Sequence, residues 1–137
     1  MSRLRLQLIS CRVFERELEV LAAHAKSELQ IRYLEMGLHE KPGDFLRAAL
    51  QEAVDAVLPG QSDAVLIGYG LCNRGLVGLK ARELPVVIPR AHDCLGILLG
   101  STKRYLGELD KEAGTYFQSA GWIENLPADK TLRPWAS

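Results

Sequence analysis

The sequence predicts an α/β fold, a Rossmann-like three-layer domain with a mostly parallel sheet of four to five strands. Strand-like and helix-like segments alternate along the chain, which is typical of a parallel sheet covered by helices. Residues 63–68 (DAVLIG) form a short, continuous apolar run, as strands buried on both faces do. A Gly-rich turn follows over residues 69–78, where that strand would leave the sheet.

Four other segments read as strands. Residues 5–10 (RLQLIS) and 29–34 (LQIRYL) alternate between apolar and other side chains, the period of a strand with two different faces. Residues 84–89 (LPVVIP) are apolar and rich in proline. Residues 115–118 (TYFQ) are a candidate for a fifth strand.

Three segments read as helices. In residues 15–27, Leu18, Leu21, Ala22 and Ala25 recur with helical spacing. Residues 45–58 are strongly amphipathic and end at a Pro-Gly pair. A third helix is expected from about residue 93 to about residue 109.

The composition fits a single domain, residues 1–137, with residues 121–137 as an irregular tail. Seventeen basic and seventeen acidic residues give no net charge, so a nucleic-acid-binding surface is not indicated. No apolar run approaches the roughly 18 residues of a membrane span, and no signal peptide is recognisable at the start. Three cysteines do not suggest a disulfide framework. We expect a cytoplasmic protein.

Residues able to bind a metal follow each of the first four expected strands. Cys11, His39, Cys72 and then His92 or Cys94 come after successive strands. Right-handed crossovers place the carboxyl ends of parallel strands at one edge of the sheet, where ligands bind in such folds. We therefore expect these side chains to meet, and adjacent first and third strands would bring Cys11 and Cys72 closest.

Three thiols and one imidazole match a tetrahedral zinc site. Soft thiolates also suit iron or an iron–sulfur cluster. No C-x₂-C spacing is present, so the prediction depends on the topology. The alternative is that the cysteines are small buried hydrophobic residues.

The segment His92-Asp93-Cys94 offers a different chemistry. A cysteine at a helix N-terminus has a lowered pKa, so Cys94 could act as a nucleophile without metal. His92 and Asp93 are then the candidate catalytic groups, although Asp93 could instead cap the helix.

The Gly-rich turn lacks the complete dinucleotide fingerprint G-x-G-x-x-G, because Asn73 occupies the last glycine position. Backbone N–H groups near Gly70 and Asn73, with Arg74 and Arg90, could still bind an anionic group. The simpler interpretation is that the glycines permit a tight turn.

The chain resembles domain-of-unknown-function family 1638, uncharacterised bacterial and archaeal proteins. The resemblance runs from about Leu8 to Glu124 and rests on motifs in the same order. These are ISC at 9–11, GLHEKP at 37–42, GYGLC at 68–72, PRAHDC at 89–94, LGS at 99–101 and GWIE at 121–124.

This resemblance implies that Cys11, His39, Cys72 and Cys94 form the metal site, and it ranks His92 below His39. Family members often lie near genes for corrinoid-dependent methyl transfer, which implies a link to one-carbon metabolism and a corrinoid carried by a partner. They also continue beyond the GWIE motif, so this chain could be truncated or could complete its sheet as a homodimer.

Two kinds of function follow. The first is a zinc enzyme or its accessory subunit, in which the metal activates a thiol for methyl transfer. The second is a non-catalytic metal or cofactor carrier, or a subunit that docks a partner. The expected partners are a small molecule or a corrinoid protein.

Overall fold

The computed structural model describes residues 3–35, 43–70, 75–91, 97–98 and 102–112. Four strands form one sheet in the order β2-β1-β3-β4, and every neighbouring pair is parallel. The strands are β1 (Arg5–Cys11), β2 (Glu28–Leu34), β3 (Ala64–Gly68) and β4 (Val86–Val87). The predicted α/β class and parallel sheet are confirmed, and the first and third strands are neighbours.

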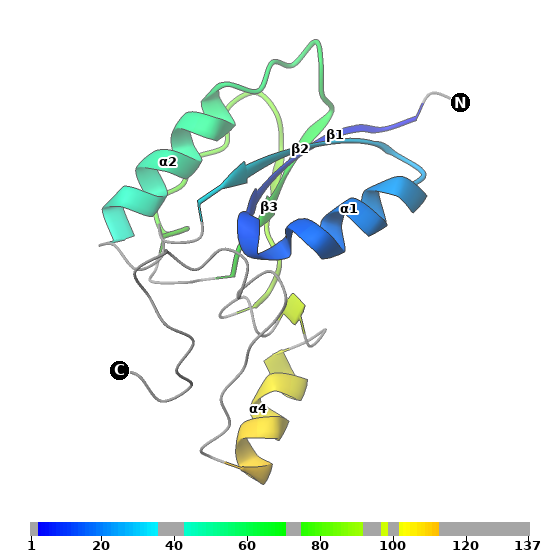
Figure 1. Ribbon diagram of the computed structural model, residues 1–137. Helices are drawn as coiled ribbons and strands as arrows, with labels where there is room; N and C mark the ends of the chain where they lie inside the picture. The colour runs from blue at the N-terminus through cyan, green and yellow to red at the C-terminus, as the bar shows by residue number, and fades with distance from the viewer. Residues whose placement is uncertain (1–2, 36–42, 71–74, 92–96, 99–101, 113–137) are drawn as a thin grey trace.

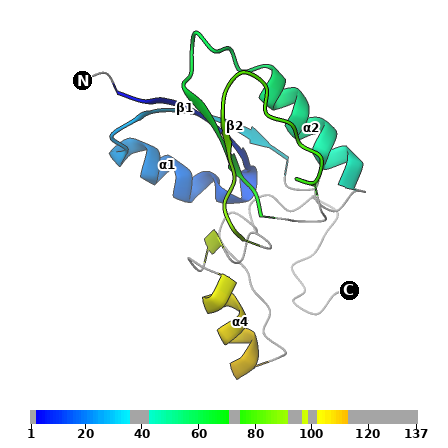
Figure 2. The same ribbon diagram turned by 180° about the vertical axis from the view of Figure 1, so that it is seen from behind.

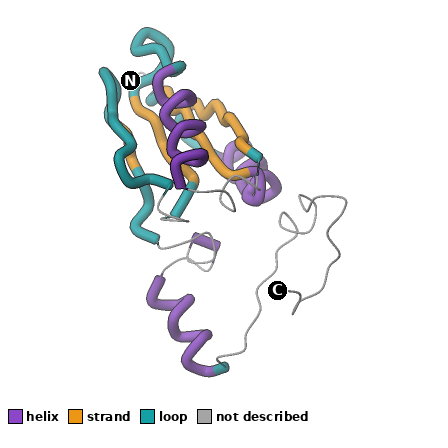
Figure 3. The backbone as a smooth tube through the Cα atoms, turned by 90° about the vertical axis from the view of Figure 1, so that its left-hand side faces the viewer, coloured by secondary structure: helices purple, strands orange, loops and turns teal. Residues whose placement is uncertain are grey.

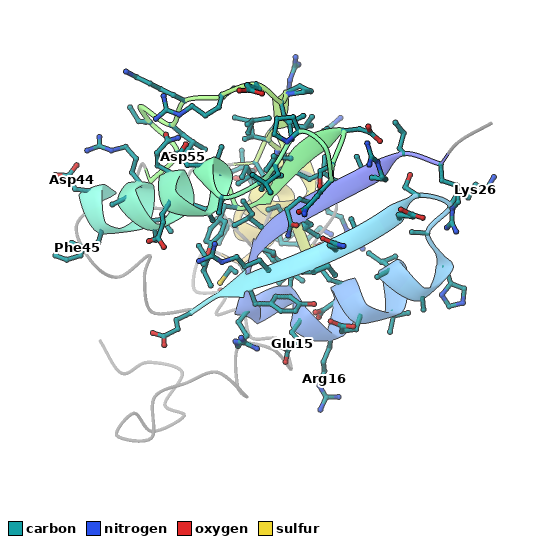
Figure 4. All side chains as sticks on the ribbon, turned by 90° about the horizontal axis from the view of Figure 1, so that it is seen from above. Glu15, Arg16, Lys26, Asp44, Phe45 and Asp55 are labelled. Carbon is teal, nitrogen blue, oxygen red and sulfur yellow. The ribbon has the colours of Figure 1, made fainter. Side chains whose placement is uncertain are left out.

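Two helices cover opposite faces of this sheet. They are α1 (Glu15–His24), which follows the short 3₁₀ turn η1 (Arg12–Phe14), and α2 (Gly43–Asp55). Figure 4 shows the strands running between them, with Asp44 and Asp55 near the two ends of α2. The domain therefore has three layers, as the alternation of segments predicted.

The main core lies between the sheet and α2. Successive residues of a strand point to opposite faces, and Ile9, Val65 and Ile67 share the α2 face with the helix residues Leu46 and Leu50. Leu46, Leu50 and Ile9 are fully buried. No residue of α1 is buried to the same degree, so the two layers of helix are packed unequally.

A polar clamp joins the amino-terminal ends of β1 and β3. The Asp63 carboxylate accepts hydrogen bonds from the Arg5 backbone N–H (2.8 Å) and from the Arg5 guanidinium (3.1 Å). The Asp63 N–H donates to the Arg5 carbonyl at 2.7 Å, and the same guanidinium donates to the Gly60 carbonyl at 2.8 Å. These bonds fix the alignment of the two central strands.

The fourth strand is much shorter than residues 84–89. Only Val86 and Val87 pair with β3, because Pro85 and Pro89 have no N–H to donate to a ladder. The Pro85 carbonyl still accepts a hydrogen bond from the Val65 N–H at 2.9 Å. The loop before β4 is attached to α2 by Gln51, whose amide side chain bonds both the N–H and the carbonyl of Lys80.

The structure describes part of the expected third helix. The structure places α4 at Thr102–Lys111 and describes residues 97–98 as helical; residues 93–96 and 99–101 of the predicted span lie outside the described residues. In Figures 1 and 2, α4 extends beyond the sheet, away from α1 and α2. The expected strand at residues 115–118 and the tail at 121–137 lie outside the described residues.

Candidate functional site at the carboxyl edge of the sheet

The carboxyl ends of all four strands lie at the same edge of the sheet because the strands are parallel. Cys11 ends β1, Leu34 ends β2 and Gly68 ends β3. The chain leaving β1 enters α1 on one face, whereas the chain after β3 packs on α2 at Gly75, on the other face. Figure 3 shows helices on both sides of the strands. Ligands of open α/β sheets bind where neighbouring connections diverge in this way.

Cys11 is the one expected metal ligand that the structure describes. It is the last residue of β1, it pairs with Leu34, and only 5% of it is exposed. It lies on the same face as Ile9 and belongs to the core between the sheet and α2. His39, Cys72 and Cys94 lie outside the described residues. Within the described ranges, no three His, Cys, Asp or Glu side chains are grouped as a metal ion would require.

The other expected site residues are divided in the same way. Gly70 is buried beside Tyr69 just after β3, and Arg90 is exposed after β4. Asn73, Arg74, His92 and Asp93 belong to parts of the chain that the structure does not describe. The described part of the edge therefore contains one thiol, one buried glycine and one exposed guanidinium from the predicted set.

Ser10 and Gly68 hold β1 and β3 together at this edge. Ser10 is completely buried, and its hydroxyl lies within hydrogen-bonding distance of the carbonyl oxygens of Cys11 (3.1 Å) and Gly68 (3.4 Å). A Cβ atom at position 68 would lie 2.7 Å from the Ser10 Cβ, closer than carbon atoms approach without strain. Gly68 is thus required by the serine on the neighbouring strand.

The chain that leaves β3 returns to pack on α2. A Cβ atom at Gly75 would lie 2.6 Å from Leu46 Cγ and 2.9 Å from Leu46 Cβ. The backbone at Gly75 therefore touches the first part of α2, on the face of the sheet that also carries Cys11. Gly70 and Gly75 are both buried, so both ends of the connection that contains Cys72 are fixed in the interior.

On the opposite face of the sheet an open cavity of about 540 Å³ lies between α1 and the strands. Its floor includes Leu8 and Leu66, and Val87 lies at its outer side. Leu18 and Leu21 of α1 form a wall, and Glu17 from the first turn of α1 also contacts the cavity. We call this cavity the α1 groove; Ser10 and Gly68 also line it, so it reaches the carboxyl edge.

One carboxylate oxygen, Glu17 Oε2, is shielded from solvent and accepts no hydrogen bond from the described residues. Glu17 is not among the site residues predicted from the sequence. No pattern in a single sequence would have identified it. The exposure of the groove depends on which helices cover which strands.

A cationic and aromatic pair borders the same edge beside Cys11. The Arg12 guanidinium lies 5.3 Å from the centre of the Tyr33 ring and forms an ion pair with Glu15. The Tyr33 hydroxyl donates to Glu19 at 2.8 Å. Burial is the largest cause of a raised pKa of Tyr33, and the hydrogen bond to Glu19 is the next largest. Tyr33 therefore stays protonated and ties the end of β2 to α1.

None of the helices in the described ranges has the length and apolar character needed to cross a bilayer. Searches of curated proteins and of solved structures returned no match. A family model described as "Protein of unknown function (DUF1638)" matches residues 33–135. Because this match spans well over half of the 137 residues, and because the motifs that suggested the family lie largely inside it, the chain belongs to that family.

Proposed function

We propose that this is a cytoplasmic metal-binding protein whose Cys₃His site, formed by Cys11, His39, Cys72 and Cys94, holds zinc. The observation that carries the proposal is the burial of Cys11 at the carboxyl end of β1, the strand between β2 and β3. The other three ligands belong to the connections that leave the remaining strands at that edge. The proposed site thus draws on all four strand ends.

The lengths of chain support this set of ligands. Cys72 is two residues from Gly70 and can lie no more than about 7 Å from it; Cys94 is three residues from Ala91 and lies within about 11 Å of it. His39 is four residues from both Glu35 and Gly43, a reach of about 14 Å from the end of β2 and the start of α2. Each anchor is a described residue at or near the carboxyl edge.

The chemistry of the donors fits zinc. Three thiolates and one imidazole form a common tetrahedral set, and Cys11 is a soft donor in a site shielded from water. Thiolate-bound zinc would lower the pKa of a substrate thiol and hold it as a nucleophile. This chemistry would suit thiol- or corrinoid-dependent methyl transfer in one-carbon metabolism. The corrinoid would be carried by a partner protein.

Iron or an iron–sulfur cluster would use the same thiolates, and metal analysis distinguishes them from zinc. A metal carrier or a partner-docking subunit is the second proposed role. The surroundings of Cys11 support this second role. Cys11 belongs to the apolar core between the sheet and α2, an environment that suits storage or structure better than proton transfer.

The test is elemental analysis of protein purified without oxygen. We expect about one zinc per chain, lost in Cys11→Ala, Cys72→Ala, Cys94→Ala and His39→Ala. His24→Ala is the matched control, because His24 is exposed on α1, where its Nδ1 lies 2.9 Å from the Val20 carbonyl oxygen. Metal-free wild-type protein would refute the proposal and direct attention to Cys94 as a nucleophile, tested by selective alkylation.

Chelation separates a structural metal from an exchangeable one. If all four protein ligands bind permanently, removal of zinc should unfold the domain, because binding energy is then folding energy. If the site opens to a substrate, circular dichroism should change little after chelation. The second result would favour an enzyme over a purely structural site.

A further inference from the structure

The α1 groove has the size and lining of a small-molecule site. Its volume of about 540 Å³ falls within the roughly 300–1,000 Å³ of typical ligand pockets. Leu8 and Leu66 on the floor and Leu18 on the wall present almost only carbon to the cavity. An occupant therefore needs an apolar body.

The position of the groove is also that of a ligand site. Ser10 and Gly68 line one end of it, where the chain leaves β1 for α1 on one face and where the chain after β3 reaches the α2 face at Gly75. This divergence between neighbouring strands is where doubly wound sheets bind their ligands. The groove and the proposed metal site lie on opposite faces of β1, since Ser10 and Cys11 are consecutive strand residues.

One buried carboxylate oxygen in this apolar lining lacks a hydrogen-bond donor. Glu17 Oε2 is buried and has no hydrogen-bond donor among the described residues, and an unpaired buried acceptor is costly. Ser10 does not satisfy it, because the Ser10 hydroxyl is directed to the backbone carbonyls of Cys11 and Gly68. An ionised carboxylate only accepts hydrogen bonds, so an occupant must supply a donor, and a cationic donor forms the stronger bond.

We propose that the α1 groove binds a small organic cation, an amine with an apolar body, and that Glu17 pairs with its ammonium group. A carboxylic acid would be repelled by Glu17, and a neutral hydrocarbon would leave the carboxylate unpaired. A second copy of the chain is a poorer occupant. The carboxylate oxygen is already shielded from solvent, so a narrow head group reaches it more readily than a folded surface does.

The experiment compares three probes with the same apolar chain on the full-length protein, namely octylammonium, octanoate and 1-octanol, by isothermal titration calorimetry. We expect one octylammonium to bind per chain, with little binding of octanoate. Glu17→Gln should weaken octylammonium about tenfold or more and change octanol binding little. Glu52→Gln, which removes the same charge from an exposed position on α2, should leave binding unchanged.

A second pair of variants tests the location without changing Glu17. Val87 at the side of the groove and Leu58 outside it are both 53% exposed. Val87→Lys should reduce octylammonium binding, because it places a cation at the groove, whereas Leu58→Lys should not. Circular dichroism and zinc content should be unchanged in all four variants, so this proposal and the metal site can fail separately.

Three results would overturn the proposal. The first is absence of octylammonium binding, and the second is equal binding of octanoate or octanol. The third is a dimer in light scattering that Val87→Lys dissociates, which would show that the groove is an interface between copies of the chain.

Discussion

Gly68→Ala is the most informative single change for the central strand pair. The new methyl group would lie 2.7 Å from Ser10 Cβ and 3.2 Å from Ser10 Cα. Ordinary carbon–carbon contacts are about 3.5–4.0 Å, so the overlap approaches 1 Å. Ser10 is fully buried and its hydroxyl contacts the Gly68 carbonyl, which leaves the serine little room to move.

Two opposing effects set the magnitude. Replacing glycine by alanine within a strand normally stabilises by about 0.5–1 kcal/mol, because glycine loses more conformational freedom on folding. Overpacking a tight interior normally costs about 1–3 kcal/mol. We therefore expect Gly68→Ala to lower the free energy of unfolding by about 1–2 kcal/mol, since a backbone-near contact has no flexible end to relax.

Urea unfolding followed by circular dichroism measures this loss. Gly60→Ala is the control, because a Cβ atom at Gly60 would meet nothing within 4 Å. Adding Ser10→Gly to Gly68→Ala should restore part of the loss, giving a coupling energy of about 0.5–3 kcal/mol in a double-mutant cycle. A Gly68→Ala protein as stable as the wild type, or no coupling to Ser10, would refute the packing argument.

Three further predictions concern stability. Leu50→Ala should cost about 2–5 kcal/mol because Leu50 is a fully buried core residue of α2, whereas Leu58→Ala at an exposed position should stay within about 0.5 kcal/mol in urea unfolding; equal losses would contradict the assigned core. Gly107→Ala should stabilise α4 by about 0.5–1 kcal/mol, since no atom lies within 4 Å of the added Cβ, and the helical circular dichroism signal should rise; a decrease would mean that α4 packs on its Gly107 side. The hydrogen bond from the Arg5 side chain holds the pKa of Asp63 below its usual 3.8. The ionised Asp63 carboxylate therefore stabilises the folded protein fully above pH 3.8. This stabilisation is lost as the pH falls through the lower pKa that Asp63 has in the folded protein. The stability difference between wild type and Asp63→Asn should therefore shrink in acid, and a difference that does not depend on pH below about 4 would count against the clamp.

The general architecture could be predicted because it depends on local patterns. The apolar run at residues 63–68 indicates a buried strand. The helical spacing of apolar residues within 45–58 indicates both a helix and its buried face. The predicted ends of the elements were less accurate where proline limits the hydrogen bonds of the backbone. Pro85 and Pro89 shorten β4 to Val86–Val87, well inside the predicted residues 84–89.

The candidate site could be predicted only in part. Topology correctly identified the edge to which Cys11 belongs, because parallel strands place their carboxyl ends together. The α1 groove and Glu17 could not be identified in this way. Leu21 is 63% exposed. Its exposure depends on how far α1 extends across β3 and β4, and the helical spacing of apolar residues does not show how far a helix extends across a sheet.

The bonds between Arg5 and Asp63 have a consequence for the distant edge of the sheet. If β1 and β3 paired one residue out of step, every side chain of the slipped strand would change faces. For β1, Leu8 would leave the floor of the groove and the thiol of Cys11 would exchange sides with the hydroxyl of Ser10. A misaligned chain would lose both the Asp63 contacts to the Arg5 backbone and the guanidinium pair. These contacts therefore favour the register that places the Cys11 thiol and the Glu17 carboxylate on opposite faces of the sheet.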